Sequence, residues 1–251
     1  MRPNLLILGG TSDATALAGA VARAGFTATL SLAGRVDHPI KSPLPQRIGG
    51  FGGAQGLAAY LAEHEVTHLI DATHPFAAQM SRNAITAAEA AGVPLVALTR
   101  PAWRAEAADH WIHVPDMSAA VAALDGPAQR IFLAIGRQQL TLFADQPQHH
   151  YVLRLVDPPT APLPLPDCEA IVSRGPFALG DDLQLLKDHR IDCVVSKNSG
   201  GSGAYAKIAA ARALSLPVVM VDRPELPERL EMSSVEEVRD WVHQATTLRG
   251  V

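Results

Sequence analysis

Short apolar runs alternate along the chain with longer alanine-rich segments whose apolar residues recur at helical spacing. Each run is nearly continuous in its apolar character, as expected of a strand that is buried on both faces of a parallel sheet. The alternation of the two kinds of segment therefore predicts successive βα units, with helices in most of the gaps between strands. The predicted strands are residues 5–8, 28–32, 47–50, 68–72, 94–98, 131–135, 151–156, 170–173, 193–196 and 218–221.

The second half of the chain repeats the pattern of the first half at a shift of about 125 residues. The paired segments are 5–10 with 131–136, 61–71 with 186–196, and 94–101 with 217–224. We therefore predict a pseudo-duplicated α/β protein of two Rossmann-like domains with mostly parallel sheets, residues 1–125 and 126–251, and a cleft between them. Unrelated βαβ segments also look alike, so the match does not by itself establish a duplication.

Composition and charge narrow the choice of partners. The 251 residues carry 21 basic and 25 acidic side chains, so no global positive field exists to attract nucleic acid or an anionic membrane. Two cysteines are too few for a disulfide framework. The first apolar run is too short for a signal peptide, and no run reaches the roughly 18 residues of a membrane span. We therefore expect a cytoplasmic protein whose anion-binding sites are local.

Cationic side chains follow six of the predicted strands, although the protein is acidic overall. Ligands of open α/β sheets bind outside the carboxyl ends of the strands, where arginine can hold carboxylates or phosphates with two hydrogen bonds. Ordinary surface salt bridges are the alternative interpretation, because such pairs are common and contribute little energy. The six residues are Arg35, Arg100, Arg137, Arg174, Lys197 and Arg223.

A glycine-rich turn, Gly9-Gly10-Thr11-Ser12-Asp13, ends the first predicted strand and opens a helix. Its backbone N–H groups and the positive end of the helix could hold a pyrophosphate. The chain lacks GxGxxG, and a tight turn in which Ser12 or Asp13 caps the helix is an equally valid interpretation. The turn alone therefore leaves nucleotide binding open.

Two further loops, 49–53 and 71–75, are expected at the same edge of the sheet. Glycine in the first loop permits close approach of the backbone to a ligand, although a structural turn would also explain it. Arg35 stands where an NAD-binding domain carries an acid for the adenine ribose, which favours a 2′-phosphate and hence NADPH over NADH. His74 is the best titratable candidate at this edge, and the alternative is a histidine that merely orders its turn.

The second half carries a comparable glycine-rich segment, Asn198-Ser-Gly-Gly-Ser-Gly203, directly after Lys197. It lacks the GxxxxGK[ST] pattern of a nucleotide P-loop, so we interpret it as a site for carboxylate capture. The segment 64–68 matches HExxH, but its two histidines straddle a predicted joint between helix and strand. A zinc site needs both on one continuous helix, so we assign no metal.

Together these segments resemble the precorrin-6A reductases of cobalamin biosynthesis. The blocks Asp71-Ala-Thr-His-Pro-Phe76 and Ser196-Lys-Asn-Ser-Gly-Gly201 are the most specific in combination. The other matching blocks are 8–14, 34–35, 49–53, 81–84, 100–101, 136–137, 174–177 and 223–224, so that the resemblance spans nearly the whole chain.

The resemblance implies an NADPH-dependent reductase that saturates a double bond of a macrocycle, converting precorrin-6A to precorrin-6B. It favours the cobalt-free ring over the cobalt-bearing one. The first domain would bind NADP and the second the acetate and propionate arms of this tetrapyrrole polycarboxylate. The implied cofactor residues are Gly9, Gly10, Thr11, Ser12, Asp13, Arg35, Gly50, Phe51, Thr73, His74 and Pro75. The implied substrate residues are Arg137, Arg174, Lys197, Ser199, Gly200, Gly201 and Arg223. His74, Lys197 or water could supply the proton.

Two other classes of function remain open from the residues. One is a different two-lobed enzyme that uses NADP or a sugar nucleotide, and the other is a non-catalytic module that binds polycarboxylates. The sequence predicts neither a nucleic-acid partner nor a membrane, and it leaves the oligomeric state open, a monomer included.

Overall fold

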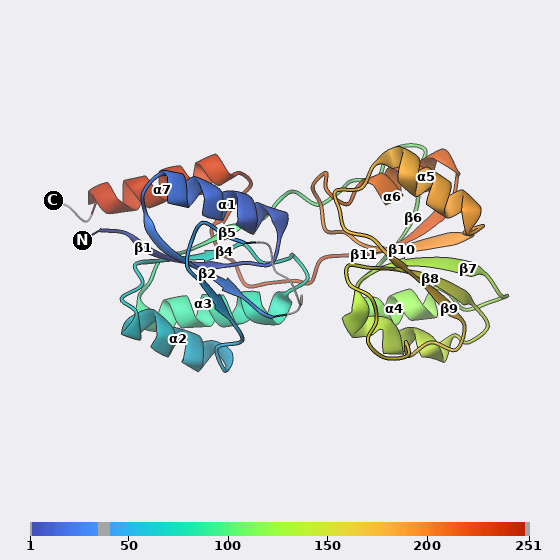
Figure 1. The fold of residues 1–251 in the computed structure, drawn as a ribbon, viewed down its shortest axis with the longest axis horizontal. Helices are drawn as coiled ribbons and strands as arrows, with labels where there is room; N and C mark the ends of the chain where they lie inside the picture. Colours follow the sequence, from blue (N-terminus) through green and yellow to red (C-terminus); the bar gives the residue numbers. More distant parts are fainter. Residues whose placement is uncertain (1, 35–40, 249–251) are drawn as a thin grey trace. The chain divides into compact units, whose positions relative to one another are not determined.

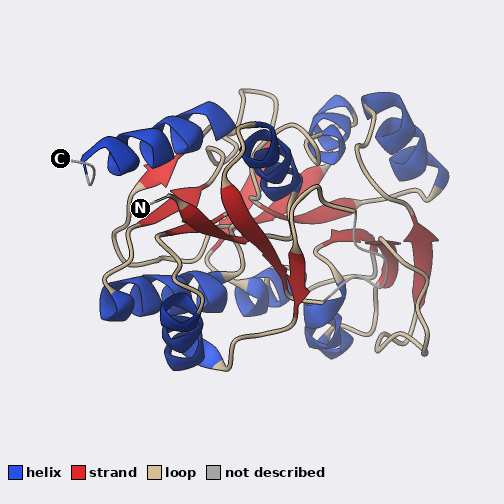
Figure 2. Ribbon diagram, turned by 60° about the vertical axis from the view of Figure 1, so that its left-hand side comes forward, coloured by secondary structure: helices blue, strands red, loops and turns tan. Residues whose placement is uncertain are grey.

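The computed structural model of the protein describes residues 2–34 and 41–248, and the chain divides into two compact units. Unit 1 comprises Met1–Pro101 and Glu225–Val251, and unit 2 comprises Ala102–Pro224. Within each unit, helices cover both faces of a six-stranded sheet in which every described strand pair is parallel (Figures 1 and 2). The predicted Rossmann-like α/β class is confirmed.

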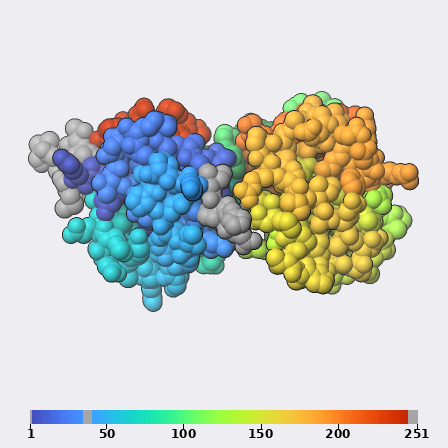
Figure 3. Space-filling model, in the orientation of Figure 1, coloured from blue at the N-terminus to red at the C-terminus, as the bar shows by residue number. Residues whose placement is uncertain are grey.

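Unit 1 has the strand order β12-β5-β4-β1-β2-β3, in which strands 3-2-1-4-5 follow the Rossmann order. Its strands are β1 (Asn4–Leu8), β2 (Thr27–Leu32), β3 (Gln46–Ile48), β4 (His68–Asp71), β5 (Leu95–Leu98) and β12 (Glu231–Met232). Its helices are α1 (Ser12–Arg23) and α7 (Val235–Leu248) on one face, and α2 (Gly53–Glu63) and α3 (Ala78–Ala91) on the other. The space-filling view shows α7, in red, beside α1, in blue (Figure 3).

Strand β1 explains why the strands read as continuous apolar runs. Leu5 and Ile7 pack into the cluster that includes α1 and α7, whereas Leu6 and Leu8 pack into the cluster that includes α2 and α3. Successive side chains of a strand point to opposite faces, so a strand with helices on both sides needs an apolar residue at every position.

Unit 2 has the strand order β6-β11-β10-β7-β8-β9. Its strands are β6 (His110–Val114), β7 (Arg130–Ala134), β8 (His150–Leu155), β9 (Cys168–Val172), β10 (Cys193–Lys197) and β11 (Pro217–Val221). Its helices are α4 (Met117–Ala122), the 3₁₀ helix η1 (Arg137–Asp145), α5 (Leu179–Asp188) and α6 (Ala206–Ala213). Helices α5 and α6 cover one face and α4 lies on the other (Figure 1).

The two sheets are equivalent strand by strand, but each takes its sixth strand from an unexpected part of the chain. Strand β6 follows β5 in sequence yet pairs with β11 of unit 2, and β12 follows β11 yet pairs with β5 of unit 1. The sixth strands are thus exchanged between the two halves. For this reason the observed units differ from the predicted division at residue 125, since 102–125 belongs to unit 2 and 225–251 to unit 1.

All ten predicted strands are present, whereas β6 and β12 were not predicted. Strand β6 lies at a sheet edge with three of its five residues exposed, and β12 has only two residues. Neither can show a buried apolar run. Among the described helices, none combines the length and apolarity that a membrane crossing requires.

Candidate active site

The turn between β1 and α1 lies where the strand order of unit 1 reverses, which is where Rossmann-like sheets bind ligands. A β-carbon on Gly9 would lie 2.7 Å from the Leu30 side chain, so any larger residue would have to displace that side chain of β2. Gly10 has φ +115°, and a β-carbon there would meet no heavy atom within 4 Å among the described residues. The turn therefore packs closely on one side and leaves open space beside the helix N-terminus.

Thr11 caps α1, although the sequence indicated Ser12 or Asp13. Its hydroxyl accepts a hydrogen bond from the Ala14 N–H at 3.0 Å and donates one to the Ala72 carbonyl at 2.8 Å. One side chain thus caps the helix and ties the ends of β1 and β4 together. Ser12 is exposed at the first helical position, where backbone N–H groups precede the first intrahelical hydrogen bond.

Asp13, a predicted cofactor residue, forms an ion pair with Arg100 at 3.1 Å. Arg100 is one of the six predicted strand-end cations. Both residues belong to unit 1 and both are partly buried, so this pair has the local character that the salt-bridge interpretation predicts.

Asp71 fixes the conformation of the 71–75 loop. The carboxylate is 3% exposed and accepts hydrogen bonds from the N–H and the hydroxyl of Thr73, at 3.1 and 2.6 Å, and from the Ser81 hydroxyl at 2.6 Å. Arg229, from the segment that returns to unit 1, forms a buried ion pair with it at 2.6 Å. Sequence reasoning missed Arg229 because it lies 158 residues from its partner and no motif surrounds it.

His74 is half-buried and takes part in its own turn. Its Nδ1 accepts a hydrogen bond from the Phe76 N–H at 3.2 Å, and its carbonyl accepts one from the Ala77 N–H at 2.7 Å. With Nδ1 as an acceptor, the neutral ring carries its proton on Nε2. The turn-ordering role that the sequence left open is therefore present.

The 49–53 loop is shaped by Arg47, which the sequence placed only within a strand. Its guanidinium donates to the carbonyls of Gly49 and Gly50, at 2.9 and 3.0 Å, and lies 3.8 Å from the centroid of the Phe51 ring. A β-carbon on Gly56 would lie 1.7 Å from the Phe51 carbonyl oxygen. Gly50 and Phe51, both predicted cofactor residues, are thus held in place, and Arg35 lies outside the described residues.

Two predicted substrate residues of unit 2 come together at Asp157, at the start of the proline-rich segment after β8. Arg137 donates to the backbone carbonyls of Asp157 and Pro158, the second at 3.0 Å. Arg174 forms an ion pair with the Asp157 carboxylate at 3.1 Å. Both arginines remain exposed, so their charges face solvent at the carboxyl edge of the sheet.

The remaining predicted substrate residues gather at the carboxyl ends of β10 and β11. Lys197 ends β10 and is half-buried, and Gly200 and Gly201 follow it with φ of +69° and +72°. Arg223 donates to the carbonyls of Asn198 and Ser199, at 3.0 and 3.1 Å. Its guanidinium therefore holds the glycine-rich loop as well as bringing a charge to it.

A buried cluster of charge lies beside this loop. Burial lowers the pKa of the Lys207 ammonium to about 7, the nearby Arg154 charge lowers it further, and Asp182 opposes both. The Lys207 ammonium donates to the Ala204 carbonyl at 2.6 Å, and Arg154 forms an ion pair with Asp182. None of these residues belongs to a motif, and only a lysine within an alanine-rich helix could have drawn notice.

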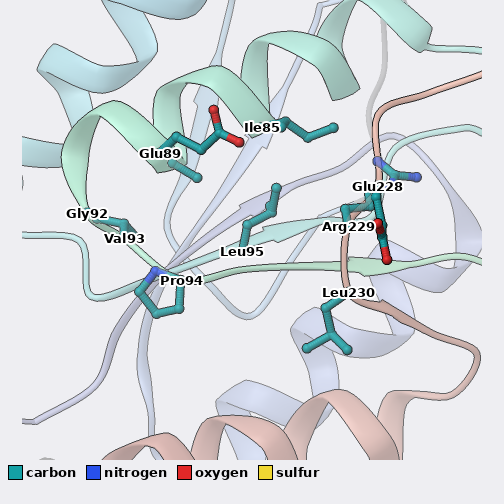
Figure 4. A pocket seen from close by; sticks show the side chains of 10 residues that line it. Ile85, Glu89, Gly92, Val93, Pro94, Leu95, Glu228, Arg229 and Leu230 are labelled. Atoms are coloured by element: carbon teal, nitrogen blue, oxygen red, sulfur yellow. The ribbon is translucent and has the colours of Figure 1, made fainter.

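A groove of about 490 Å³ lies elsewhere in unit 1, between α3 and the returning segment (Figure 4). Gly92, Val93 and Pro94 line it at the amino end of β5, with Glu89 and Glu228 among its side chains. Its place opposite the carboxyl edge and its two acids do not suit an anionic dinucleotide.

His64 caps the end of α2 and His68 begins β4, so the two histidines of the HExxH segment lie at the predicted joint between helix and strand.

Comparisons of the sequence and of the structure with known proteins both find precorrin-6A reductases. The family model described as precorrin-6x reductase CbiJ/CobK matches residues 4–243. A precorrin-6A reductase of Rhodobacter capsulatus is 55% identical over 98% of this chain and 99% of its own length. A cobalt-precorrin-6A reductase of Priestia megaterium is 30% identical over 93% and 96%. The solved structure of CobK precorrin-6A reductase superposes with a TM-score of 0.93 at 53% identity, covering 97% of both chains.

Proposed function

The chain belongs to the precorrin-6x reductase family, which reduces precorrin-6A in cobalamin biosynthesis, and we propose that unit 1 binds NADPH as the reductant. The chain is an oxidoreductase acting on precorrin-6A, and its reaction needs a reduced nucleotide cofactor. The cobalt-free substrate agrees with the 55% identity to a precorrin-6A reductase, against 30% to a cobalt-precorrin-6A reductase. We also propose that the protein acts in the cytoplasm, where its reduced nucleotide cofactor would be available.

One observation carries the cofactor proposal: Gly10 faces open space among the described residues, beside a helix N-terminus and at the point where the strand order reverses. The backbone N–H groups of Gly10, Thr11 and Ser12 suit the pyrophosphate, as at other helix N-termini. We assign this role to the backbone because the Thr11 hydroxyl already caps the helix and bonds the Ala72 carbonyl. NADPH, when bound, supplies the hydride that saturates the double bond. The other residues proposed around it are Gly9, Asp13, Arg35, Gly50, Phe51, Thr73, His74 and Pro75.

The loop 73–75 is proposed to flank the nicotinamide, since it extends from β4, the strand next to β1. Asp71 holds this loop through Thr73 and through the buried Arg229, so its shape does not depend on ligand contacts. A preformed loop can exclude water from the reacting atoms without a cost of ordering. The proton for the ring is proposed to come from His74 in its protonated form or from the Lys197 ammonium, with water as the alternative.

Unit 2 is proposed to bind the carboxylate arms of the substrate. Its predicted cations occupy two places at the carboxyl edge of its sheet: Arg137 and Arg174 meet at Asp157, and Lys197 and Arg223 meet at the glycine-rich loop. Ser199, Gly200 and Gly201 lie in that loop. Exposed guanidinium groups and backbone amides both favour carboxylates, and two separated groups of them suit a ring that carries several arms.

The experiment is to follow the absorbance of NADPH while precorrin-6A is added to the purified protein. We expect NADPH to be consumed, and NADH to replace it poorly. Turnover that needs no NADPH would favour an enzyme of another class, and carboxylate binding without NADPH consumption would favour a binding module. Arg35→Ala should remove the preference for NADPH over NADH, and an unchanged preference would show that another residue selects the 2′-phosphate.

A further inference from the structure

The loop at residues 198–203, between β10 and α6, is held by a residue that lies far from it in sequence. Asn198 is 5% exposed, and its side chain accepts a hydrogen bond from the Trp103 N–H at 2.8 Å and donates one to the Trp103 carbonyl at 3.0 Å. In return, the indole Nε1–H of Trp103 donates to the Gly201 carbonyl at 2.7 Å. Trp103 is therefore bonded to both ends of the glycine-rich stretch.

These contacts decide which way the peptide groups of the loop point. In a trans peptide the carbonyl and the following N–H point in opposite directions. The Gly201 carbonyl faces Trp103, so the Ser202 N–H faces away from Trp103. In the same way the Ser199 carbonyl faces Arg223, and the Gly200 N–H faces away from it. The Gly200 and Ser202 amides thus point away from the side chains that hold the preceding carbonyls, and loops of this kind bind anions through such amides.

The loop needs such support because regular structure does not fix it. Gly200 and Gly201 both have positive φ and lie between the end of β10 and the start of α6. Glycine in this conformation has many alternatives, so the direction of each peptide plane depends on its hydrogen bonds. Losing the bond to the Gly201 carbonyl would release the plane that carries the Ser202 N–H.

The indole ring of Trp103 is itself fixed in orientation. It lies 5.7 Å from the Tyr205 ring, and the Lys207 ammonium lies 4.9 Å from its centroid. Lys207 also donates to the Ala204 carbonyl, next to the loop. Cation–π and ring contacts of this kind hold an aromatic side chain in one rotamer, which aims its single N–H donor.

We propose that Trp103 is a positioning residue for substrate binding: by holding the Gly201 carbonyl, it turns the Ser202 amide toward a carboxylate arm of precorrin-6A. This inference rests on the proposed role of the 198–203 loop in binding the substrate. It assigns a function to a residue that belongs to none of the blocks by which the sequence resembles its family.

The test is Trp103→Phe, which keeps an aromatic ring against Tyr205 and Lys207 but removes the N–H donor. We expect KM for precorrin-6A to rise about threefold to tenfold, the range for loss of one neutral hydrogen bond. The values of kcat and of KM for NADPH should stay within the error of the wild-type values. The matched control is Trp111→Phe, in β6 of the same unit, which should change none of the three.

Lys197→Ala in the same assay separates this inference from the proposed function. If Lys197→Ala leaves KM for precorrin-6A unchanged, the loop does not bind the substrate and the proposed function of unit 2 is wrong. If Lys197→Ala raises that KM and Trp103→Phe does not, the positioning role is wrong while the substrate site stands. A rise of both KM values in Trp103→Phe would show general loss of structure and would also overturn the positioning role.

Discussion

Asp71 is the residue that fixes the conformation of the proposed cofactor loop 73–75. It and Arg229 are both more than nine-tenths buried, so Asp71→Ala would leave the buried guanidinium with only its ion pair to the exposed Glu231. We expect the free energy of unfolding to fall by about 3–5 kcal/mol and KM for NADPH to rise, because Thr73 loses two hydrogen bonds. Urea titration and steady-state kinetics measure the two effects. The control Asp240→Ala breaks an exposed pair with Arg239 and should change neither the free energy of unfolding nor KM for NADPH. Equal stability of the two variants would contradict a stabilising role for the buried Asp71 carboxylate.

Lys207 should make stability depend on pH. Burial lowers its pKa to about 7 in the folded protein, against 10.5 for the ordinary side chain, so between these values the unfolded chain holds the extra proton. Stability of the wild type therefore rises with pH across this window, and the penalty is fully present below about pH 7. Lys207→Met should raise stability at neutral pH and flatten that slope, measured by urea titrations between pH 7 and about pH 10. Lys187→Met, on α5, should keep the wild-type slope.

At this scale the sequence identified where charges stand but not what they bind. Arg223 was expected to bind the substrate, and the structure shows in addition that its guanidinium bonds two carbonyls of the neighbouring loop. Arg47 and Arg229 carry the conformation of two proposed cofactor loops and were not expected at all. Position after a strand is a local property that the sequence contains, whereas a partner 158 residues away, as for Arg229, depends on the whole fold.

At the scale of an element, helix α2 shows how a loop can constrain the helix that follows it. The Phe51 carbonyl approaches Gly56 so closely that a β-carbon there would overlap it. Gly56→Ala should therefore destabilise unit 1 by about 1–3 kcal/mol, despite the higher helix propensity of alanine. Thermal unfolding checks the prediction. The control is Gly180→Ala in α5, where a β-carbon meets no heavy atom within 4 Å among the described residues. It should stabilise the protein by roughly 0.5–1 kcal/mol. Equal destabilisation by both variants would argue against steric overlap as the cause.

The elements themselves were predictable to the extent that their faces are buried. The eight inner strands of the two sheets are mostly apolar on both faces, and the sequence shows them as apolar runs, whereas β3 and β9, which were also predicted, lie at sheet edges. Edge strand β6 begins and nearly ends with histidine, His110 and His113, and its pattern resembles a surface loop. Strands at an edge are identified by their pairing with a neighbour, and pairing is a property of the assembled sheet.

At the scale of the whole molecule, the exchange of β6 and β12 decides which pieces of chain can fold alone. A fragment of residues 102–224 contains a complete sheet and should unfold cooperatively in urea. A fragment of residues 126–251 lacks β6 and carries α7 without the sheet that α7 covers. We expect it to show no cooperative transition in circular dichroism. A cooperative transition for 126–251 and none for 102–224 would mean that the two halves are independent as the repeat suggests.

The same exchange sets the order in which the two units become complete as the chain is synthesised. As the chain leaves the ribosome from its amino end, every strand of unit 2 emerges before β12 and α7 exist. The core of unit 1 includes Val238 and Val242 of α7, so that unit remains unfinished until these residues have been added. Because domains fold as units, unit 2 can be completed from residues that precede the last strand and helix of unit 1. A chain truncated at residue 224 would accordingly contain unit 2 in full and a unit 1 that lacks both β12 and α7.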